Sequence, residues 1–281
     1  MKIGILGQGY VGSAIKIGLE KHYKDINTFD KYSKSKSTVS NLEELTKSSE
    51  IIFVCLPTPM KENGECDIGI VKKEIEKINK YSTHKKVVVI KSTVPPDTTK
   101  KINNSSKNID VIFNPEFLTE RNFIEDFKKQ NRIVLGGNQK PVDTVQQIYT
   151  KVFPNTTIIK TDSTTAEMIK YFTNTFLASK VSFANEIKII CDEIDVDYDE
   201  VVEYSLYDQR IGKSHLDVPG PDGKLGFGGS CFPKDINALI YFAKQKGIDL
   251  DVLKSVWKTN LKVRPEKDWE ELEGRAVISK D

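Results

Sequence analysis

The chain has 281 residues, of which 38% are hydrophobic and 29% charged, and its formal net charge at pH 7 is +2. This composition is typical of a globular protein long enough for two modest domains. The near balance of charge gives no reason to expect nucleic acid or an anionic membrane as partner. No stretch approaches the roughly 20 apolar residues that span a bilayer, and the N-terminus lacks a signal-peptide pattern. We therefore expect a cytoplasmic protein.

A glycine motif lies near the N-terminus, between a predicted strand and a predicted helix. An apolar strand at 2–6 leads into Gly7-Gln8-Gly9-Tyr10-Val11-Gly12, and a helical pattern follows over 11–21. The first glycine permits a tight turn, the second lets the backbone approach a pyrophosphate, and the third allows close packing of helix on strand. A second strand at 26–30 ends in Asp30, whose carboxylate accepts hydrogen bonds from a ribose 2′-hydroxyl and repels a 2′-phosphate. The pattern predicts a dinucleotide site that prefers NAD to NADP.

Strands and helices continue to alternate after this motif. Further strands are predicted at 51–56, 86–90, 111–114 and 133–135, and helices at 41–47, 68–81 and 141–152. Continuous apolar strands joined by helices are typical of a parallel, doubly wound sheet. We expect this α/β domain to extend over residues 1–162.

From about residue 161 the pattern becomes helical. Residues 163–193 are predicted to form one long helix that is apolar on most sides, which is usual for a helix buried between domains or against a second copy. Shorter helices are predicted at 198–207, 235–246 and 250–262, with a loop rich in glycine and proline over 211–232. We predict a helical domain over 163–263, containing this loop, and a loose charged tail over 264–281.

The four cysteines include no Cys-x-x-Cys pair, and only three histidines accompany them, so neither a metal site nor a disulfide framework is predicted. Cys55 follows a buried strand and Cys191 lies on the long helix, so both are interpreted as core residues. Cys66 lies in a loop and is interpreted as an exposed bystander. Cys231 alone is flanked by glycines and followed by a lysine and an aspartate, a type of setting that can lower a thiol pKa and supply a base.

Cys231 is therefore the candidate nucleophile. A thiolate traps an aldehyde as a thiohemiacetal, which can lose a second hydride to become a thioester. Together with the dinucleotide motif, this predicts a four-electron oxidation of an alcohol to a carboxylate.

The positions of three more residues are compatible with such a reaction, although position alone does not select them. Lys170 and Asn174 lie four residues apart on the predicted long helix, so both can donate to one developing oxyanion. From the residues alone, a lysine such as Lys170 is more often a solvated surface lysine. Glu116 follows a proline at the end of an apolar strand, the edge where doubly wound sheets place ligands, and its alternative is an ordinary loop carboxylate.

Six motifs, spread in order over nearly the whole chain, resemble those of the UDP-glucose/GDP-mannose dehydrogenase family. They are Gly7 to Gly12, Leu56-Pro57-Thr58-Pro59, Lys91-Ser92-Thr93-Val94-Pro95, Asn114-Pro115-Glu116-Phe117-Leu118, Lys170-Tyr171-Phe172-Thr173-Asn174, and Gly228-Gly229-Ser230-Cys231-Phe232-Pro233-Lys234-Asp235. The resemblance implies a Rossmann-like N-terminal domain and a helical central domain whose long helix forms a homodimer. It also implies NAD-dependent, two-step oxidation at C6 of a nucleotide sugar.

The resemblance assigns roles to individual residues. The cofactor-binding set is Gly7, Gly9, Tyr10, Val11, Gly12, Asp30, Thr58, Thr93, Glu120 and Lys234. The substrate-binding set is Glu116, Phe117, Leu118, Glu120, Lys170, Asn174, Arg210, Phe227, Gly228 and Gly229, with Arg210 reaching the substrate of the neighbouring subunit. The catalytic set is Cys231, Lys170, Asn174, Asp235, Glu116 and Thr93. Thr93 would hold the catalytic water, and Asp235 would position or deprotonate it.

Two departures from the family pattern bear on the substrate. Thr119 stands where the family usually has an arginine, with Arg121 two places on, so one contact is lost or relocated. The family normally carries a second Rossmann-like domain, and this chain stops soon after the central helices. A partner chain that supplies the missing surface, a naturally minimal enzyme and one with little activity are the alternatives.

The motif around Cys231 resembles the UDP-glucose and GDP-mannose branches of the family, and UDP-glucose is favoured. Two rival hypotheses are a two-electron β-hydroxyacid dehydrogenase, which needs a lysine on the long helix but no cysteine, and a non-catalytic NAD-binding or dimerising remnant. The presence of Cys231 counts against the first. The presence of Lys170, Asn174 and Asp235 beside it counts against the second.

Overall fold

The computed structural model describes residues 1–279, and the chain divides into two compact units. The sheet unit comprises Met1–Thr58 and Ile68–Lys170, and the helical unit comprises Pro59–Asp67 and the chain from Tyr171 onward. The division differs from the expected one at residue 162. The first turns of the long helix belong to the sheet unit because side chains such as Ala166 pack into its core.

A seven-stranded sheet in the order β2-β1-β3-β4-β5-β6-β7 forms the centre of the sheet unit. Its strands are β1 (Ile3–Leu6), β2 (Ile26–Phe29), β3 (Ile51–Val54), β4 (Lys86–Ile90), β5 (Ile109–Phe113), β6 (Arg132–Gly136) and β7 (Thr157–Thr161). All neighbouring pairs are parallel except β5 and β6. The predicted α/β fold is confirmed, whereas β7 and the antiparallel step were not predicted. Strand β7 is largely exposed and so lacks the continuous apolar run of a buried parallel strand.

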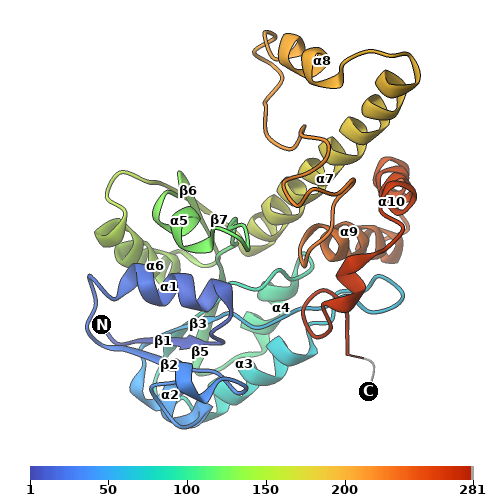
Figure 1. Cartoon of the computed structure of the whole chain (residues 1–281). Helices are drawn as coiled ribbons and strands as arrows, with labels where there is room; N and C mark the ends of the chain where they lie inside the picture. Colours follow the sequence, from blue (N-terminus) through green and yellow to red (C-terminus); the bar gives the residue numbers. More distant parts are fainter. Residues whose placement is uncertain (280–281) are drawn as a thin grey trace. The chain divides into compact units, whose positions relative to one another are not determined.

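Helices cover both faces of this sheet (Figure 1). Helices α1 (Tyr10–Leu19), α5 (Phe123–Lys128) and α6 (Gln139–Val152) pack on one face. Helices α2 (Leu42–Ser48), α3 (Gly69–Tyr81) and α4 (Thr98–Ser105) pack on the other. The sequence did not predict α4 or α5, because each buries a single large apolar side chain, Ile102 and Phe127 respectively, too few for a visible helical period.

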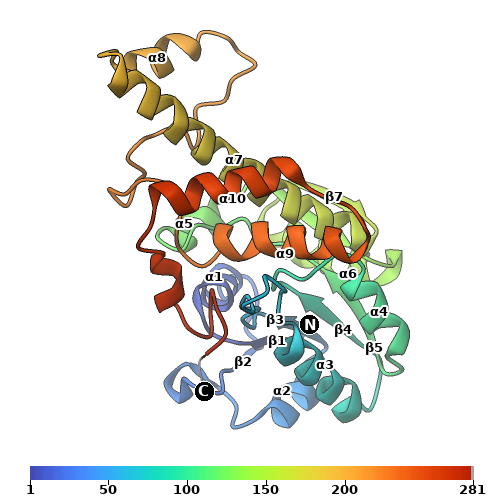
Figure 2. The same ribbon diagram turned by 90° about the vertical axis from the view of Figure 1, so that its right-hand side faces the viewer.

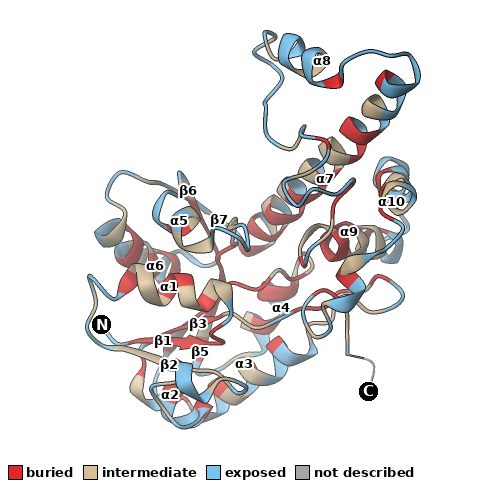
Figure 3. Ribbon diagram, in the orientation of Figure 1, coloured by how far each residue is buried: buried red, intermediate tan, exposed pale blue. Residues whose placement is uncertain are grey.

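The helical unit is built on α7 (Ser163–Glu193), whose bounds match the predicted long helix. It is followed by α8 (Tyr198–Ser205), α9 (Phe232–Gln245) and α10 (Asp251–Val263). Helices α9 and α10 run side by side (Figure 2). Two small apolar clusters hold the unit together, one around Phe227 and Ile236 and the other around Cys191 and Tyr198. Buried and exposed residues alternate along α7 (Figure 3).

The residues after α10 differ from the expected loose tail over 264–281. Arg264 and Trp269 are only 2% and 1% exposed. The Arg264 guanidinium donates to Asp222 at 2.7 Å and to Asp268 at 2.6 Å, and the following segment bonds the backbone of Met60. Burial alone would lower the pKa of Arg264, but the two carboxylates outweigh it and raise that pKa. Arg264, one of the charges that suggested a solvated tail, is thus paired inside the unit. Residues 280 and 281 lie outside the described part of the chain.

A buried carboxyl group joins α7 to the start of α4. Glu167 is fully buried and accepts hydrogen bonds from the backbone N–H groups of Asp97 at 2.6 Å and Thr99 at 2.8 Å. The N-terminus of a helix favours such a negative charge. Burial nevertheless raises the pKa of Glu167 to about 7, well above its ordinary value of 4.5.

We predict that Glu167 makes the free energy of unfolding fall as the pH rises. Its pKa is higher in the folded state, so the folded chain binds more protons between the two values. The favourable contribution is complete below the unfolded pKa and is lost as the pH rises through the folded pKa, by about 3 kcal/mol at most. Urea unfolding of the wild type and of Glu167→Gln, which cannot titrate, measures this. A difference between the two that stays constant from about pH 4.5 to 7.5 would contradict it.

Candidate functional site

The glycine motif forms the turn between β1 and α1. Gly7 has φ +89°, and a Cβ atom there would lie 2.4 Å from the carbonyl oxygen of Cys55. A Cβ on Gly12 would lie 1.9 Å from the carbonyl oxygen of Gly7, so only glycine fits at either position. A Cβ on Gly9 would meet no atom within 4 Å. The backbone at Gly9 is therefore open to a ligand at the N-terminus of α1, which fits the pyrophosphate of NAD.

Asp30 lies directly beside this turn. One carboxylate oxygen accepts the backbone N–H of Gln8 at 2.7 Å, and the other accepts those of Tyr32 and Ser33 at 2.9 Å. A carboxylate offers about four acceptor positions, so a ribose hydroxyl can still donate to it. The parallel pairing of β1 with β2 brings the two predicted halves of the cofactor site together. Tyr10 and Val11 are the first residues of α1.

Thr58 and Thr93 follow the neighbouring strands β3 and β4. The Thr58 hydroxyl donates to the backbone oxygen of Thr93 at 2.8 Å, and Thr58 is buried. Thr58 thus lies beyond the carboxyl end of β3, the strand next to β1, and Thr93 lies beyond that of β4, the strand next to β3. This is the edge at which doubly wound sheets bind ligands.

A buried ion pair lies beyond the ends of β4 and β5. Lys91 Nζ is 3.0 Å from Glu116 Oε2 and 2.9 Å from Asn114 Oδ1. Burial alone would lower the pKa of Lys91, but the facing Glu116 carboxylate outweighs it and the pKa is raised. Lys170 Nζ, on α7, donates to the backbone oxygen of Glu116. The structure therefore brings together Glu116 and Lys170, and it adds Lys91, to which the sequence analysis gave no role.

The rest of the Asn114–Leu118 motif surrounds this pair less closely. The Phe117 ring has Lys170 Nζ 5.3 Å and the Arg132 guanidinium 4.4 Å from its centre. Leu118 packs against the core below α1, and Glu120 is exposed. Thr119, at the place of the expected arginine, donates its backbone N–H to Asp126 at 2.8 Å.

Cys231 occupies the N-cap position of α9, which begins three residues earlier than predicted. A helix N-terminus stabilises a thiolate. In the first turn, Lys234 forms an ion pair with Asp235, which is 1% exposed. Burial alone would lower the pKa of Lys234, but the charges of Asp235 and Cys231 outweigh it and raise that pKa. Asn174 Nδ2 donates to Asp235 Oδ2 at 2.5 Å. Four predicted residues are thus close together in the helical unit.

The loop that leads to Cys231 is held by side chains that the sequence analysis missed. The Asn260 amide accepts the N–H of Phe227 at 2.7 Å and donates to its carbonyl at 2.9 Å, and Asn185 accepts the N–H of Gly226 at 3.1 Å. A Cβ on Gly228 would lie 2.5 Å from the Arg264 guanidinium. The sequence contained one signal for this role, because Asn260 lies on the apolar side of the helix predicted at 250–262.

Arg210 pairs with a residue outside the predicted set. Its side chain is 89% exposed, and its hydrogen bonds go to Asp208, two residues earlier. Its predicted contact with a neighbouring subunit stays a prediction.

The other three cysteines occupy different surroundings. Cys66 is 6% exposed, so the interpretation as an exposed bystander is wrong, because a short bridge to Met60 draws its loop inward. Burial raises the pKa of the Cys55 thiol to about 12, and Cys191 is buried on α7. No disulfide joins any of the four, all of which lie in the described part of the chain.

Residues 1–279 contain neither a metal cluster nor a membrane-spanning helix. No group of three or more His, Cys, Asp or Glu side chains in this range has the arrangement needed to hold a metal ion. None of the helices in the same range combines the length and apolar character needed to cross a membrane.

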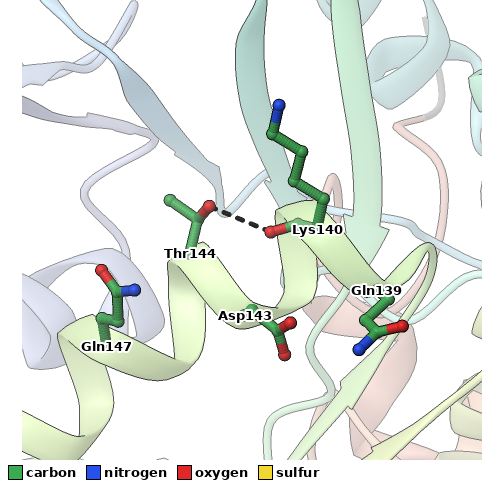
Figure 4. Close-up of a pocket in the computed structure, with 5 residues that line it drawn as sticks. All are labelled: Gln139, Lys140, Asp143, Thr144 and Gln147. Atoms are coloured by element: carbon green, nitrogen blue, oxygen red, sulfur yellow. Dashed lines mark hydrogen bonds between the residues drawn. The ribbon is translucent and has the colours of Figure 1, made fainter.

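A surface hollow of about 370 Å³ lies on α6 (Figure 4). It is lined by Gln139, Lys140, Asp143, Thr144 and Gln147. The Thr144 hydroxyl donates to the backbone oxygen of Lys140 at 3.0 Å, and Asp143 pairs with a lysine of β7. Polar side chains of a single helix do not enclose a ligand, so this hollow is not a candidate site.

A glycine turn and an acidic residue at the ends of adjacent strands of a doubly wound sheet define a dinucleotide-binding α/β protein. Residues 30–153 match the NAD binding domain of the UDP-glucose/GDP-mannose dehydrogenase family, and residues 164–262 match the central domain of the same family. The chain belongs to this family. The predicted family and the predicted cofactor, NAD, are confirmed.

Individual relatives agree with this assignment. The chain is 42% identical over 229 residues to UDP-glucose 6-dehydrogenase of Rickettsia bellii. The matched region covers 79% of this chain and 51% of that protein. It is 35% identical to the enzyme of the same name from Rickettsia typhi, over 94% of this chain and 68% of that one. The solved UDP-glucose dehydrogenase of Pyrobaculum islandicum superimposes with a TM-score of 0.84 at 29% identity, over 93% of this chain and 68% of its own. The chain spans about half the length of curated relatives such as the Rickettsia bellii protein.

We predict that Asp30 imposes the preference for NAD over NADP. Replacing it by alanine removes a charge-assisted hydrogen bond to the ribose and should weaken NAD binding by about 1–2 kcal/mol. The difference in affinity between NAD and NADP should become smaller. Titration of both cofactors by protein fluorescence measures this, with Asp30→Asn as the control that keeps an acceptor but loses the charge. Equal affinity of the wild type for NAD and NADP would contradict the assignment.

Proposed function

We propose that this protein catalyses the NAD-dependent, four-electron oxidation of UDP-glucose to UDP-glucuronate. The observation that carries the proposal is Cys231 at the N-cap of α9, with Lys234, Asp235 and Asn174 packed around the same helix end. A two-electron dehydrogenase has no use for such a thiol. Relatives named UDP-glucose 6-dehydrogenase supply the choice of substrate.

Cys231 acts as the nucleophile in this proposal. Its thiolate adds to the C6 aldehyde to form a thiohemiacetal, which loses hydride to become a thioester, and water hydrolyses the thioester to the acid and the thiol. NAD, when bound, accepts the hydride removed in each of the two oxidations. Asp235 orients the attacking water and takes its proton, and Asn174 holds the Asp235 carboxylate for this task.

Lys170 and Asn174 stabilise the oxyanion of both tetrahedral intermediates. They lie four residues apart on α7, so their side chains leave the helix on the same face. Donors that are already oriented towards the developing charge lower the barrier without reorganising. Contacts to the nucleotide sugar are assigned to Glu116, Phe117, Leu118, Glu120, Phe227, Gly228 and Gly229, and cofactor contacts to Gly7–Gly12, Asp30, Thr58, Thr93, Glu120 and Lys234. Thr93 also holds the catalytic water.

The proposal predicts two NADH for each UDP-glucose consumed. Absorbance at 340 nm with limiting sugar nucleotide measures the ratio, and GDP-mannose in a parallel assay tests the alternative substrate. One NADH per sugar would point to an alcohol dehydrogenase of the β-hydroxyacid type. The absence of NADH with either substrate would point to a cofactor-binding remnant.

The matched variant is Cys231→Ser, because a serine hydroxyl has a far higher pKa and forms no comparably labile thioester. We expect it to stall before the acid, while Cys55→Ser, Cys66→Ser and Cys191→Ser still release two NADH. Full conversion of UDP-glucose to UDP-glucuronate by Cys231→Ser would overturn the assignment of the nucleophile.

We further propose that the chain works as a homodimer through α7. The apolar side chains that α7 leaves exposed are Met168, Phe172, Phe176, Phe183, Ile189 and Ile190. Phe172 and Phe183 are 67% and 62% exposed, which is unusual for aromatic rings on a soluble surface. A second copy would cover this row, and a stable interface of this kind buries more than about 1,000 Å².

Mixing two inactive chains tests whether the dimer completes its site in trans. If Arg210 reaches the substrate of the neighbouring subunit, a heterodimer of Cys231→Ser and Arg210→Ala chains regains one site that has both residues. We expect activity above that of either parent in the mixture, with Cys231→Ser mixed with Cys231→Ala as the control that regains none. If heterodimers form but activity is not recovered, Arg210 acts on the substrate of its own subunit.

A further inference from the structure

Lys91 lies at the centre of a polar cluster inside the sheet unit. It directly follows β4, and Asn114 directly follows β5, two paired strands whose last residues, Ile90 and Phe113, lie opposite each other. Its side chain is only 3% exposed. A buried ammonium group is costly unless charge and hydrogen bonds compensate it, so the contacts around Lys91 need an explanation.

Asn114 and Tyr149 form defined hydrogen bonds around Lys91. Asn114 Oδ1 accepts from Lys91 at 2.9 Å and from the Tyr149 hydroxyl at 2.6 Å, and Asn114 Nδ2 donates to the Val134 carbonyl at 2.7 Å. These three bonds fix the orientation of the Asn114 amide. Burial raises the pKa of Tyr149 to about 12, so the hydroxyl is a neutral donor. The cluster therefore holds the Lys91 ammonium in one place.

Lys91 in turn fixes Glu116. One carboxylate oxygen lies 3.0 Å from Lys91 Nζ, and the other accepts the backbone N–H of Phe117 at 2.9 Å. The backbone oxygen of the same Glu116 accepts from Lys170 Nζ. A continuous chain of contacts thus runs from Lys91 through Glu116 to the Lys170 ammonium.

The energetics favour a role other than stability. A buried ion pair repays its desolvation poorly, and well-packed apolar residues of similar size often stabilise a protein as well or better. The pair instead fixes positions, because it holds the Glu116 carboxylate in one orientation, and the backbone of the same residue holds the Lys170 ammonium. Catalytic groups need such fixing, since a displacement of about 1 Å can cost about 10²-fold in rate.

We infer that Lys91 is a positioning residue of the reaction, which orients Glu116 directly and Lys170 through Glu116. The inference rests on the proposed function, in which Glu116 contacts the sugar and Lys170 stabilises the oxyanion. Lys91 itself touches neither substrate nor cofactor in this scheme.

Steady-state kinetics of Lys91→Met, Glu116→Gln and the double variant test the inference. We expect Lys91→Met to lower kcat by about 10²-fold while the KM for NAD changes less than about threefold. Because Lys91 acts through Glu116, the double variant should be no slower than the slower single variant. A kcat within about threefold of the wild type, or single losses that multiply in the double variant, would overturn it.

The matched control is Lys86→Met at the other end of the same strand. Lys86 is 2% exposed and donates to the Ser49 carbonyl at 2.5 Å, so it is an equally buried lysine outside the proposed machinery. Its replacement should lower the melting temperature and leave kcat unchanged. The double variant Lys91→Met/Glu116→Gln removes both charges together and keeps the experiment informative if Lys91→Met alone does not fold. An equal loss of kcat in Lys86→Met would make the Lys91 effect one of general stability and overturn the inference.

A crystal structure of the Lys91→Met protein separates this inference from the proposed function. We expect the Glu116 carboxylate and Lys170 Nζ to move by more than about 1 Å, the scale on which rates change. Unmoved side chains would overturn the positioning role even if the wild type oxidises UDP-glucose. A wild type that is inactive on every nucleotide sugar would overturn the proposed function and the role of Lys91 in that reaction. The displacement of Glu116 and Lys170 in the variant would still show which groups Lys91 positions.

Discussion

The parallel direction of strands β1 to β5 is the constraint on which the sheet unit depends. Parallel strands place their carboxyl ends at one edge, so residues far apart in the sequence become neighbours there. Gly7 follows β1, Asp30 follows β2, Lys91 follows β4 and Asn114 follows β5. Each of these positions faces its neighbour through the strand register rather than through the loops. The loops that follow the strands carry polar side chains. Hydrogen bonds such as that between Thr58 and Thr93 hold these loops against the edge of the sheet.

The helical unit depends on a different constraint, the ordering of the glycine-rich loop that leads to its candidate nucleophile. Such a chain segment has many conformations to lose on folding. Two buried polar side chains at the end of α10 stabilise one of these conformations. Asn260 hydrogen-bonds both backbone polar groups of Phe227, and Arg264, directly after the helix, pairs with two carboxylates. Cys231 then begins α9 at the point where the ordered loop ends.

Sequence reasoning found the features whose signal is local. The glycine turn, the bounds of α7 and the positions of strands β1 to β6 along the chain follow from short patterns of apolar and small residues. It missed features whose meaning depends on a distant partner. Lys91 and Arg264 resemble surface residues until Glu116, Asp222 and Asp268 are placed beside them. The helices α4 and α5 and the exposed strand β7 were missed because each buries too few apolar side chains to show a period.

The burial of the cysteines has a consequence for chemical labelling. Burial raises the pKa of the Cys55 thiol to about 12, so this thiol stays protonated at neutral pH, and thiolates rather than thiols react with electrophiles. Cys66 and Cys191 are shielded by packing, at 6% and 5% exposure. Cys231 is half-buried and stands at the positive end of a helix. We therefore expect a small alkylating reagent to modify Cys231 first, so that a spectroscopic probe attaches at the candidate nucleophile without removal of the other three cysteines.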